Sequence, residues 1–442
     1  MDALWITLYW LVSGAALLQA LLIALQTWEH RRFLRSRLTR LERCPRKGRA
    51  LLIVPCRGAE PGLEQNLRTM LRQDYGNYQV RFVVESVQDP AWPVICRLLA
   101  EHPQVKAECR VAGIASTSGQ KVHNLLTATD DIPYDIHYLA FADSDARLRP
   151  QWLRALVSNL EEPCVAAATG YRWHVSARPS LAACLLHSVN ASVAVFLGKN
   201  SPTVVWGGSW AIRRTMFEEM RLRQAWKGKI DEDLVAGEQF RNAGHHVEYE
   251  PACMVASDGE TSLGNLFAFA RRQYQLVRFY SRPAWRVILL SSLLTNVGFW
   301  GNAIAAAVLF ALGSSPANGP AMMTAALYLA HILAGLIRQD VAVRYFPHRR
   351  RRLRAARLFE VFAGPLAALF NLTLVVASGF GHTVRWRGIA YRLDDAGMIE
   401  SIERPTSADL PTVIHVRLSV PNVPFGSGLE PLPAGKSDSS DR

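Results

Sequence analysis

The sequence predicts an α/β domain with a Rossmann-like wound sheet that is joined to transmembrane helices. Short apolar runs with strand character alternate with a helical pattern through residues 50–285. A charge-free stretch of membrane length precedes this region, and further apolar runs follow it. Half of the 442 residues are hydrophobic, which is enough for one large core and additional membrane segments.

The first 30 residues predict an N-terminal transmembrane anchor. Residues 3–26 carry no charge and are long enough to cross a bilayer. Positive charges follow this stretch, whereas in a cleaved signal peptide they come first. Residues 31–49 contain nine Lys or Arg and one acid, Glu42, so they form a basic juxtamembrane segment. We therefore expect the N-terminus outside and the following domain in the cytosol.

The α/β elements are expected in the first half of the chain. Leu51–Pro55, Val80–Val84 and Tyr138–Ala142 are short apolar runs typical of buried strands. Gly62–Gln73, between the first two, has helical spacing, and Val247–Glu250 predicts another short strand. Strands that alternate with helices imply a parallel sheet, with ligands bound at the carboxyl ends of its strands.

Residues 286–400 predict a C-terminal membrane region. Its apolar runs at 287–312 and 321–337 are long enough to be spans. A third run, 358–380, contains Pro365 and a polar asparagine, so it forms a full span, a kinked hairpin or a re-entrant segment. A full span would place Arg385-Trp386-Arg387 outside, whereas this basic patch is expected on the cytosolic face.

Positive charge is concentrated beside the apolar runs. The formal net charge is +13, and a basic loop at residues 338–357 has eight Arg and one acid, Asp340. Both basic clusters flank hydrophobic spans, as the positive-inside rule and attraction to anionic headgroups predict. No recognition motif for nucleic acid accompanies the charge, so we expect the bilayer as a partner and no nucleic acid. Seven scattered cysteines indicate reduced thiols and no structural zinc.

Two segments have mixed patterns. Leu181–Gly198 is mostly apolar but includes His187 and Asn190. It is either an interfacial helix that presents lipid to the site or a buried helix of the domain. The tail, residues 401–442, is rich in Pro, Ser and Gly, which predicts a largely disordered segment.

Two acidic clusters point to the chemistry of the domain. Asp143-Ser144-Asp145 directly follows a strand-like run. Two carboxylates one residue apart at the end of a strand are suited to hold a divalent cation, Mg²⁺ or Mn²⁺, against a diphosphate. Asp231-Glu232-Asp233 is suited to activating a hydroxyl, because neighbouring like charges raise the pKa of Asp233. The alternative for this cluster is an acidic first turn of a helix.

Further motifs accompany the acidic clusters and resemble those of a known family. In chain order they are Val54-Pro55-Cys56-Arg57-Gly58, Glu85 to Ala91 with Asp89, Gly119-Gln120-Lys121-Val122-His123-Asn124-Leu125, Trp206-Gly207-Gly208-Ser209 with Arg213-Arg214, and Arg385-Trp386-Arg387-Gly388 with Tyr391. Together they resemble inverting GT-A glycosyltransferases of the family 2 clan. More narrowly, the chain resembles ceramide glucosyltransferases and their bacterial relatives, including those that glycosylate hopanoids.

The resemblance implies a GT-A fold and a role for each motif. Asp145 is the expected metal ligand, Asp143 lies near the ribose or shares the cation through water, and Asp233 is the expected catalytic base with Glu232 beside it. The other expected contacts are Pro55 and Asp89 with the nucleotide, Lys121 and Arg272 with the departing diphosphate, and Trp206, Gly207, Gly208 and Gln273 with donor or acceptor. Plainer alternatives are a turn residue for Asp89, solvated charges for Lys121 and Arg272, and a core residue for Trp206.

One motif of the family is only half present. The (R/Q)-x-x-R-W motif of these enzymes corresponds here to residues 272–276, with Gln275 and Leu276 where Arg and Trp are expected. Arg272 fills the first position. The departure favours a bacterial offshoot that acts on a different lipid.

These observations predict a membrane-bound inverting glycosyltransferase that moves a sugar from a UDP-sugar donor to a lipid acceptor. We expect it in a bacterial inner membrane with the catalytic domain in the cytosol; ceramide, hopanoid and diacylglycerol all fit as acceptors. One alternative is a processive polysaccharide synthase of the same clan, which needs more spans and an intact R-W pair. The other is a non-catalytic membrane protein, and the absence of a repeat and of charges within the spans disfavours a transporter.

Overall fold

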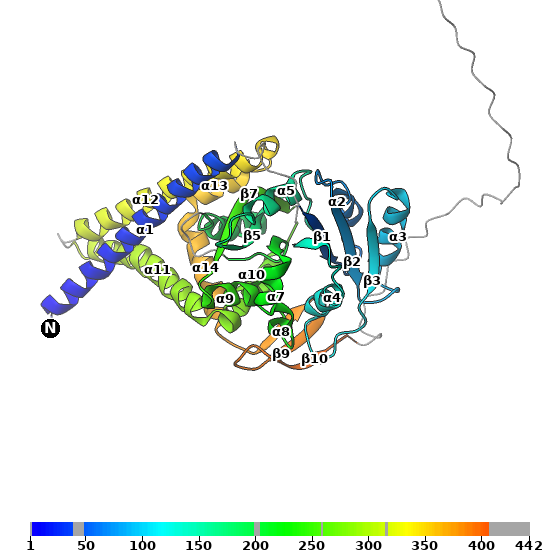
Figure 1. Ribbon diagram of the computed structural model, residues 1–442. Coiled ribbons are helices and arrows are strands. Elements are labelled where there is room, and N and C mark those ends of the chain that lie inside the picture. Colours follow the sequence, from blue (N-terminus) through cyan, green and yellow to red (C-terminus); the bar gives the residue numbers. More distant parts are fainter. Residues whose placement is uncertain (1, 39–47, 199–203, 258–259, 314–316, 406–442) are drawn as a thin grey trace, which may run out of the picture. The chain divides into compact units, whose positions relative to one another are not determined.

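A seven-stranded sheet forms the centre of the domain that follows the first helix (Figure 1). The computed structural model describes residues 2–38, 48–198, 204–257, 260–313 and 317–405. The strand order is β3-β2-β1-β4-β6-β5-β7. The strands are β1 (Arg49–Pro55), β2 (Tyr78–Val84), β3 (Ala107–Val111), β4 (Ile136–Ala142), β5 (Val165–His174), β6 (Ser209–Arg213) and β7 (His246–Ser257). All four strands expected from the sequence are therefore present.

The sheet is mixed, where the sequence predicted a parallel one. Strands β1 to β4 are parallel, but β6 lies antiparallel between β4 and β5. The register explains the reversal, because Ser209, the first residue of β6, pairs with Ala142, the last residue of β4. The chain thus enters β6 at the carboxyl edge of the sheet and runs back across it. Strands β5 and β7 are again parallel, so the parallel prediction holds for the other six strands and is wrong for β6.

Alternating side chains of the strands supply two apolar faces. In β1, Leu52 and Val54 belong to one core cluster, and Leu51 and Ile53 belong to the other. The first face is covered by α2 (Leu63–Met70), α3 (Ala91–Glu101) and α5 (Trp152–Asn159), and the second by α4 (Gln120–Ala128), α7 (Arg214–Glu219), α8 (Leu222–Trp226) and α9 (Asp233–Asn242). A central sheet with helices on both faces is the doubly wound arrangement that the sequence predicted.

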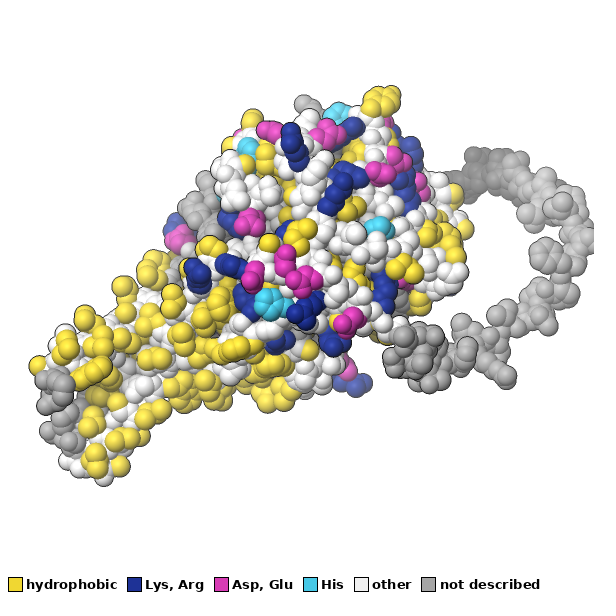
Figure 2. All heavy atoms as spheres, turned by 90° about the horizontal axis from the view of Figure 1, so that it is seen from below, with side chains coloured by type: hydrophobic (Ala, Val, Ile, Leu, Met, Phe, Trp, Pro, Cys, Tyr) yellow, Lys and Arg dark blue, Asp and Glu magenta, His cyan; other side chains and the backbone are white. Residues whose placement is uncertain are grey.

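Three helices are long and apolar enough to cross a membrane. They are α1 (Asp2–Leu38), α11 (Arg282–Ala311) and α12 (Asn318–Tyr345), which pack against one another. Hydrophobic side chains crowd over these helices, and charged side chains gather over the sheet domain (Figure 2). Polar contacts between the helices are few; one joins Gln19 to Thr295 at 2.7 Å. An apolar outer surface with sparse internal polar pairs is what a lipid environment favours.

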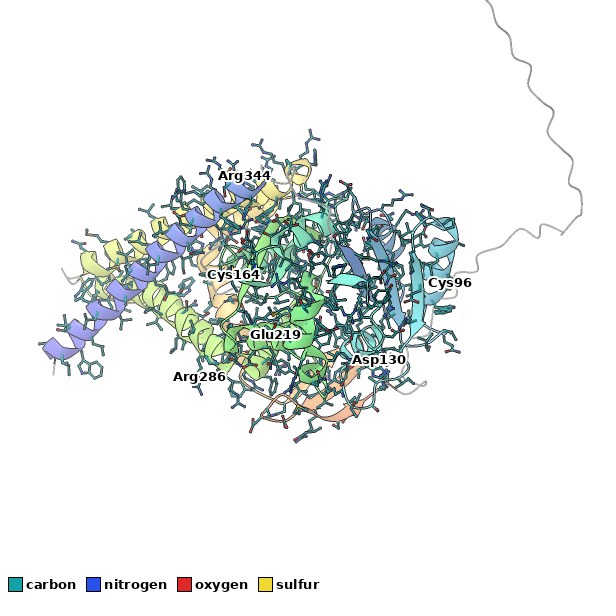
Figure 3. All side chains as sticks on the ribbon, viewed as in Figure 1. Cys96, Asp130, Cys164, Glu219, Arg286 and Arg344 are labelled. Carbon is teal, nitrogen blue, oxygen red and sulfur yellow. The ribbon has the colours of Figure 1, made fainter. Side chains whose placement is uncertain are left out.

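The basic ends of these helices meet beside the sheet domain. Arg31 of α1 forms an ion pair of 2.6 Å with Asp340 of α12. The Tyr345 hydroxyl, at the end of α12, lies 2.8 Å from the hydroxyl of Tyr249 in β7. Arg344 in the last turn of α12 therefore lies at the domain end of that helix (Figure 3). Both basic clusters face the same side as far as they are described; residues 39–47 lie outside the described part.

The third C-terminal apolar run forms a bent pair of helices. Helices α13 (Arg354–Phe362) and α14 (Gly364–Ser378) meet at an angle of 86°, and Pro365 begins the second of them. Proline is tolerated in a first helical turn but ends a preceding helix. The bent pair is long and apolar enough to be a broken span or a re-entrant loop, two of the forms that the sequence left open.

A small three-stranded sheet closes the described chain. Its strands are β8 (Thr383–Trp386), β9 (Ile389–Leu393) and β10 (Ile399–Glu403), in the order β10-β9-β8. Arg387 and Gly388 form the β8–β9 turn with positive φ values of 47° and 81°, as type I′ hairpin turns require. Residues 406–442 of the tail lie outside the described residues.

Helix α6 (Leu181–Ala194) is the mostly apolar segment with two possible interpretations. Most of its residues are buried, and it packs against β5, α13, α14 and α10 (Leu263–Tyr280). Its first residue, Leu181, is exposed. The buried-helix interpretation therefore describes most of α6.

Candidate active site

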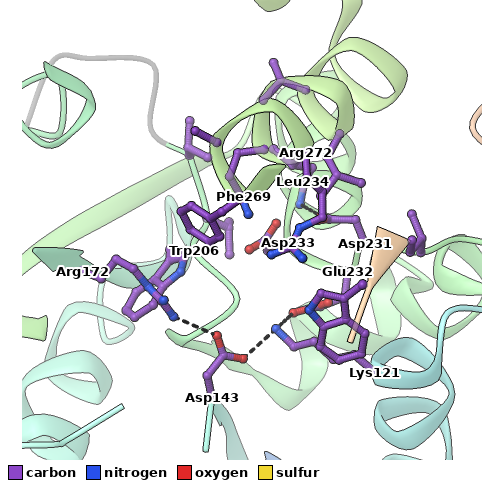
Figure 4. A pocket seen from close by; sticks show the side chains of 18 of the residues that line it. Lys121, Asp143, Arg172, Trp206, Asp231, Glu232, Asp233, Leu234, Phe269 and Arg272 are labelled. Carbon is purple, nitrogen blue, oxygen red and sulfur yellow. Dashed lines mark hydrogen bonds and ion pairs between the residues drawn. The ribbon is translucent and has the colours of Figure 1, made fainter. Parts of the chain in front are cut away.

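The two acidic clusters meet at the carboxyl edge of the sheet. Asp143 and Asp145 follow β4, and Glu232 and Asp233 stand at the start of α9. These residues line one cavity of about 650 Å³ (Figure 4). Nine of the residues that the sequence singled out line it: Pro55, Lys121, Asp143, Asp145, Trp206, Glu232, Asp233, Arg272 and Gln273.

Lys121 joins the two acidic clusters. Its ammonium nitrogen lies 2.7 Å from Asp143 Oδ1 and 2.6 Å from Glu232 Oε1. Helix α4 begins at Gln120, so Lys121 projects from the first turn of a helix whose N-terminus faces the carboxyl edge. Although burial alone lowers the pKa of Lys121, Asp143 and Glu232 raise it above its ordinary value. Lys121 is therefore a fixed positive charge between the clusters rather than a solvated surface residue.

The carboxylates differ in how readily they hold a proton. Burial would raise the pKa of Asp143, but Lys121 and Arg172 hold it below its ordinary value. Burial raises the pKa of Glu232 to about 7, with Lys121 opposing this shift and Asp233 adding to it. Burial also raises the pKa of Asp233 well above its usual range, and the charge and hydrogen bond of Asp231 add to the effect. Asp143 is thus held ionised, whereas Glu232 and Asp233 bind protons more readily than ordinary carboxylates.

Gly207 makes the meeting of these groups possible. Its backbone N–H donates to Asp233 Oδ2. A Cβ atom at this position would lie 2.9 Å from the Lys121 ammonium and 2.8 Å from Asp233 Oδ2, and it would also collide with Glu232. Any larger residue would force these three side chains to move from their positions. A Cβ at the neighbouring Gly208 would collide with the Trp206 ring.

Arg172 is a residue of the site that the sequence analysis missed. It belongs to β5, and its guanidinium lies 3.4 Å from Asp143 and 3.3 Å from Asp145. The same guanidinium lies 4.8 Å from the centre of the Trp206 ring. Figure 4 shows it facing Asp143 from the side opposite Lys121. Residue alternation along β5 would have placed it on the cavity face, had that strand been predicted.

The acidic pair after β4 fits a divalent cation that is completed by substrate oxygens. Among the described residues, no group of three or more His, Cys, Asp or Glu side chains is arranged to hold a metal. Mg²⁺ in phosphate-transfer sites is held by one or two carboxylates together with phosphate oxygens and water. Asp143 and Asp145 supply two such carboxylates, and Asp145 is more than a third exposed. The donor set therefore matches a cation that binds together with a diphosphate.

Asp89 lies outside the residues that line the cavity. One of its carboxylate oxygens accepts hydrogen bonds from the amides of Gly58 and Ala91, both at 2.8 Å. It thereby fixes the turn after β1, which carries the cavity-lining Arg57. Its predicted contact with the nucleotide stays a prediction.

The half-present motif lies on α10. Arg272 lines the cavity and stacks on Phe269, 5.5 Å from the ring centre. Burial and the charge of Arg172 lower the pKa of Arg272 to about 10. Gln275 faces away and donates to the carbonyl of Phe380 at 3.3 Å. The glutamine that replaces the expected Arg therefore ties α10 to the segment before β8.

The hairpin between β8 and β9 also reaches the cavity. Trp386 and Arg387 line it, and Arg387 forms an ion pair of 2.8 Å with Glu60. The hairpin therefore covers one side of the site, and the Tyr391 hydroxyl accepts a hydrogen bond of 3.2 Å from the amide of Gln120.

Away from the charged groups the cavity wall is apolar. Leu186, Val189 and Val193 of α6 line this part together with Ala284 and Ile288 of α11. Helix α11 is one of the three helices long enough to cross a membrane. The cavity therefore has one charged region and one apolar region that continues onto this helix.

The wound mixed sheet, the two acidic clusters at its carboxyl edge and the adjoining apolar helices define a glycosyltransferase of the GT-A fold. The chain belongs to glycosyl transferase family 21, whose sequence model matches residues 11–399. This confirms the resemblance to ceramide glucosyltransferases that the motifs indicated.

Individual relatives are distant. Ceramide glucosyltransferase 1 of Caenorhabditis elegans is 25% identical over 109 residues, which are 25% of this chain and 23% of that protein. The processive diacylglycerol beta-glycosyltransferase of Mycoplasma pneumoniae is 23% identical over 115 residues, 25% of this chain and 31% of that protein. The matches thus span less than a third of these relatives. Among solved structures, a mannosyltransferase from Pyrobaculum calidifontis in complex with GDP-Man and Mn²⁺ has a TM-score of 0.45 and 19% identity, covering 79% of this chain and 99% of that one.

Proposed function

We propose that this chain transfers one sugar, with inversion, from a UDP-sugar to the hydroxyl of a membrane lipid. The observation that carries the proposal is the bridge that Lys121 forms between Asp143 and Glu232 inside a cavity whose apolar wall continues onto α11. A donor with a charged diphosphate and an acceptor with an apolar body match the two regions of this cavity. The proposed location is a bacterial inner membrane with the sheet domain in the cytosol, which agrees with the basic ends of α1 and α12 beside that domain.

The charged region would receive the donor. Asp143 and Asp145 would hold a divalent cation, which when bound neutralises the diphosphate. Lys121 and Arg272 supply further positive charge for the departing diphosphate, and Arg272 is held at the cavity by its contact with Phe269. The backbone turn at Gly58 and the residues around Pro55 face the same edge.

Asp233 would take the proton of the acceptor hydroxyl. Its raised pKa makes it a stronger proton acceptor than an ordinary carboxylate, and the Gly207 amide fixes one of its oxygens. Direct attack by the activated hydroxyl, with the diphosphate leaving on the opposite side, inverts the configuration at the sugar carbon. Asp231 and Glu232 tune the base, and Lys121 keeps Glu232 in place.

A donor and acceptor screen tests the proposal. Detergent-solubilised full-length protein is offered labelled UDP-glucose, UDP-galactose, UDP-N-acetylglucosamine or GDP-mannose with a bacterial lipid extract and Mn²⁺ or Mg²⁺. Thin-layer separation and mass spectrometry then identify any product. We expect one new glycolipid with a UDP-sugar, lost in Asp233→Asn and on chelation. The matched control is Asp395→Asn, which changes a largely exposed carboxylate.

The product pattern separates the competing functions. A ladder of polymer would support a processive synthase, and a product with retained anomeric configuration would exclude the inverting mechanism. Absence of any product and of UDP-sugar binding, in protein that melts cooperatively, would overturn the proposal and favour a non-catalytic role.

A further inference from the structure

His174 stands between the charged and the apolar regions of the cavity. It is the last residue of β5 and lines the cavity wall. Side chains two residues apart on a strand point to the same face, so His174 shares its face with Arg172. Arg172 contacts Asp143 and Asp145. His174 therefore lies between Arg172, which contacts the acidic pair, and the apolar wall that would hold the acceptor.

The His174 ring has a hydrogen-bonding atom without a partner. Among the described residues, none forms a hydrogen bond with its Nδ1 atom, although that atom is buried. The ring packs edge-on against Phe269, with 6.0 Å between ring centres. Burial, and then the charges of Arg172 and His187, lower the pKa of His174 to about 3, so the ring is neutral. A neutral imidazole offers one donor and one acceptor, and burying either without a partner is costly.

The backbone of His174 is held in place from both sides. Its N–H donates to Asn190 Oδ1 at 3.1 Å, and its carbonyl lies 3.1 Å from His187 Nδ1. On the other side of the His187 ring, Nε2 lies 3.1 Å from the side-chain nitrogen of Gln339 in α12. The His187 ring thus contacts the end of β5 through one nitrogen and α12 through the other. The polar residues that interrupt α6 thus connect a membrane helix to this end of β5.

The surroundings of His174 suit a lipid headgroup. The apolar wall formed by α6 and Ile288 of α11 accommodates hydrocarbon, while Asp233 is the proposed base for the reacting hydroxyl. A lipid seated along this wall brings the polar atoms near its hydroxyl to the boundary where His174 lies. An unpartnered ring nitrogen at such a boundary is suited to recognise one of these atoms.

We propose that His174 hydrogen-bonds a second polar group of the lipid acceptor, beside the hydroxyl that receives the sugar. This inference rests on the proposed function and narrows the acceptor to lipids with a neighbouring hydroxyl, amide or ester. A simple long-chain alcohol lacks that group, so it is a poor acceptor. His174 is an acceptor-binding residue in this account and takes no part in proton transfer.

The test compares His174→Phe, His174→Asn and wild type as full-length protein in detergent micelles. Phe keeps the ring packed on Phe269 but removes both ring nitrogens, whereas Asn keeps a donor and an acceptor. The probe is the bacterial lipid extract, titrated at saturating UDP-sugar, with transfer of the labelled sugar measured. We expect kcat/KM for the extract to fall by at least tenfold in His174→Phe and by less than threefold in His174→Asn. The donor KM stays within twofold of wild type in both variants.

A matched control replaces an exposed histidine, His137→Phe on β4, which lies outside the cavity-lining residues and is expected to behave as wild type. Equal kcat/KM in His174→Phe and wild type would overturn the inference while leaving the transfer reaction established. An equal fall in donor and acceptor affinity, or an equal loss in His174→Asn, would also overturn it, since either result assigns the ring a structural role. Absence of transfer by wild type would instead reject the proposed function itself.

Discussion

Gly207→Ala is the change that most directly tests the arrangement of the site. The new methyl would lie 2.9 Å from the Lys121 ammonium and 2.8 Å from Asp233 Oδ2, and nearer still to Glu232. Ordinary contacts begin at 3.4 Å, so Lys121 and Asp233 must each retreat by about 0.5 Å and Glu232 by about 1 Å. Gly207 has no positive φ, so alanine brings no backbone strain of its own. The substitution therefore acts on the side chains around it.

The size of the effect follows from the geometry of catalysis. A displacement of about 1 Å in a positioned catalytic group costs on the order of 100-fold in rate. We expect kcat of Gly207→Ala to fall by about that factor, because the lysine bridge and the base are displaced together. Overpacking costs about 1–3 kcal/mol in stability, so the protein still folds. The assay is initial-rate sugar transfer at saturating donor, combined with thermal melting.

The control is Gly76→Ala, at an exposed glycine where a Cβ meets no atom within 4 Å and the φ value is not positive. This variant is expected to match wild type in rate and melting temperature. Activity of Gly207→Ala within threefold of wild type would refute the reasoning, since the acidic cluster would then tolerate a methyl group in its midst. A large fall in melting temperature with full specific activity would assign the glycine to folding alone.

Three further predictions concern charges. In Lys121→Met the two acidic clusters lose the ammonium group between them, so transfer falls by about 100-fold or more and the pKa of Asp143 rises. Initial rates and a donor titration measure this, and a rate within threefold of wild type would contradict it. In Asp231→Asn the charge that raises the pKa of Asp233 is absent, and the base works only when deprotonated. The acid limb of the pH–rate profile therefore moves to lower pH, whereas an unchanged limb would separate Asp231 from the base. In Arg338→Met, loss of the buried 2.8 Å ion pair with Glu360 destabilises the protein by about 3 kcal/mol. The double variant with Glu360→Gln should regain much of the lost stability in thermal melting, whereas additive losses would show that the two residues are not coupled.

Local patterns explain what the sequence revealed about the fold. The buried strands of the α/β domain are apolar runs, and the three long helices are apolar over membrane length, so hydropathy alone identifies them. The antiparallel β6 could not be predicted in this way, because its direction depends on where the chain re-enters the sheet. The pairing of Ser209 with Ala142 is a contact between distant parts of the sequence.

The same distinction holds for the site. Asp143 and Glu232 belong to recognisable acidic strings beside a strand end and a helix start, and the structure brings both into one cavity. Arg172 stands in an ordinary strand sequence, and nothing in that sequence marks it as the partner of Asp143. The hairpin residue Arg387 reaches the cavity only because β8 and β9 fold back over the turn after β1. Arg172 is therefore found from three-dimensional contacts alone, whereas for Arg387 the sequence showed a motif but not its place at the cavity.

The polar residues within α6 connect the membrane helices to the site. His187 links Gln339 of α12 to the carbonyl of His174, and Asn190 binds the backbone of both Arg172 and His174. Strand β5 thereby places Arg172 against the acidic pair and His174 against the apolar wall. The end of this strand is held by His187, whose ring also contacts Gln339 of α12. A sheet domain separated from α12 would lose this support at the strand that carries both contacts. Helix α12, one of the three helices long enough to cross a membrane, therefore also helps to set the geometry of the cavity at the end of β5.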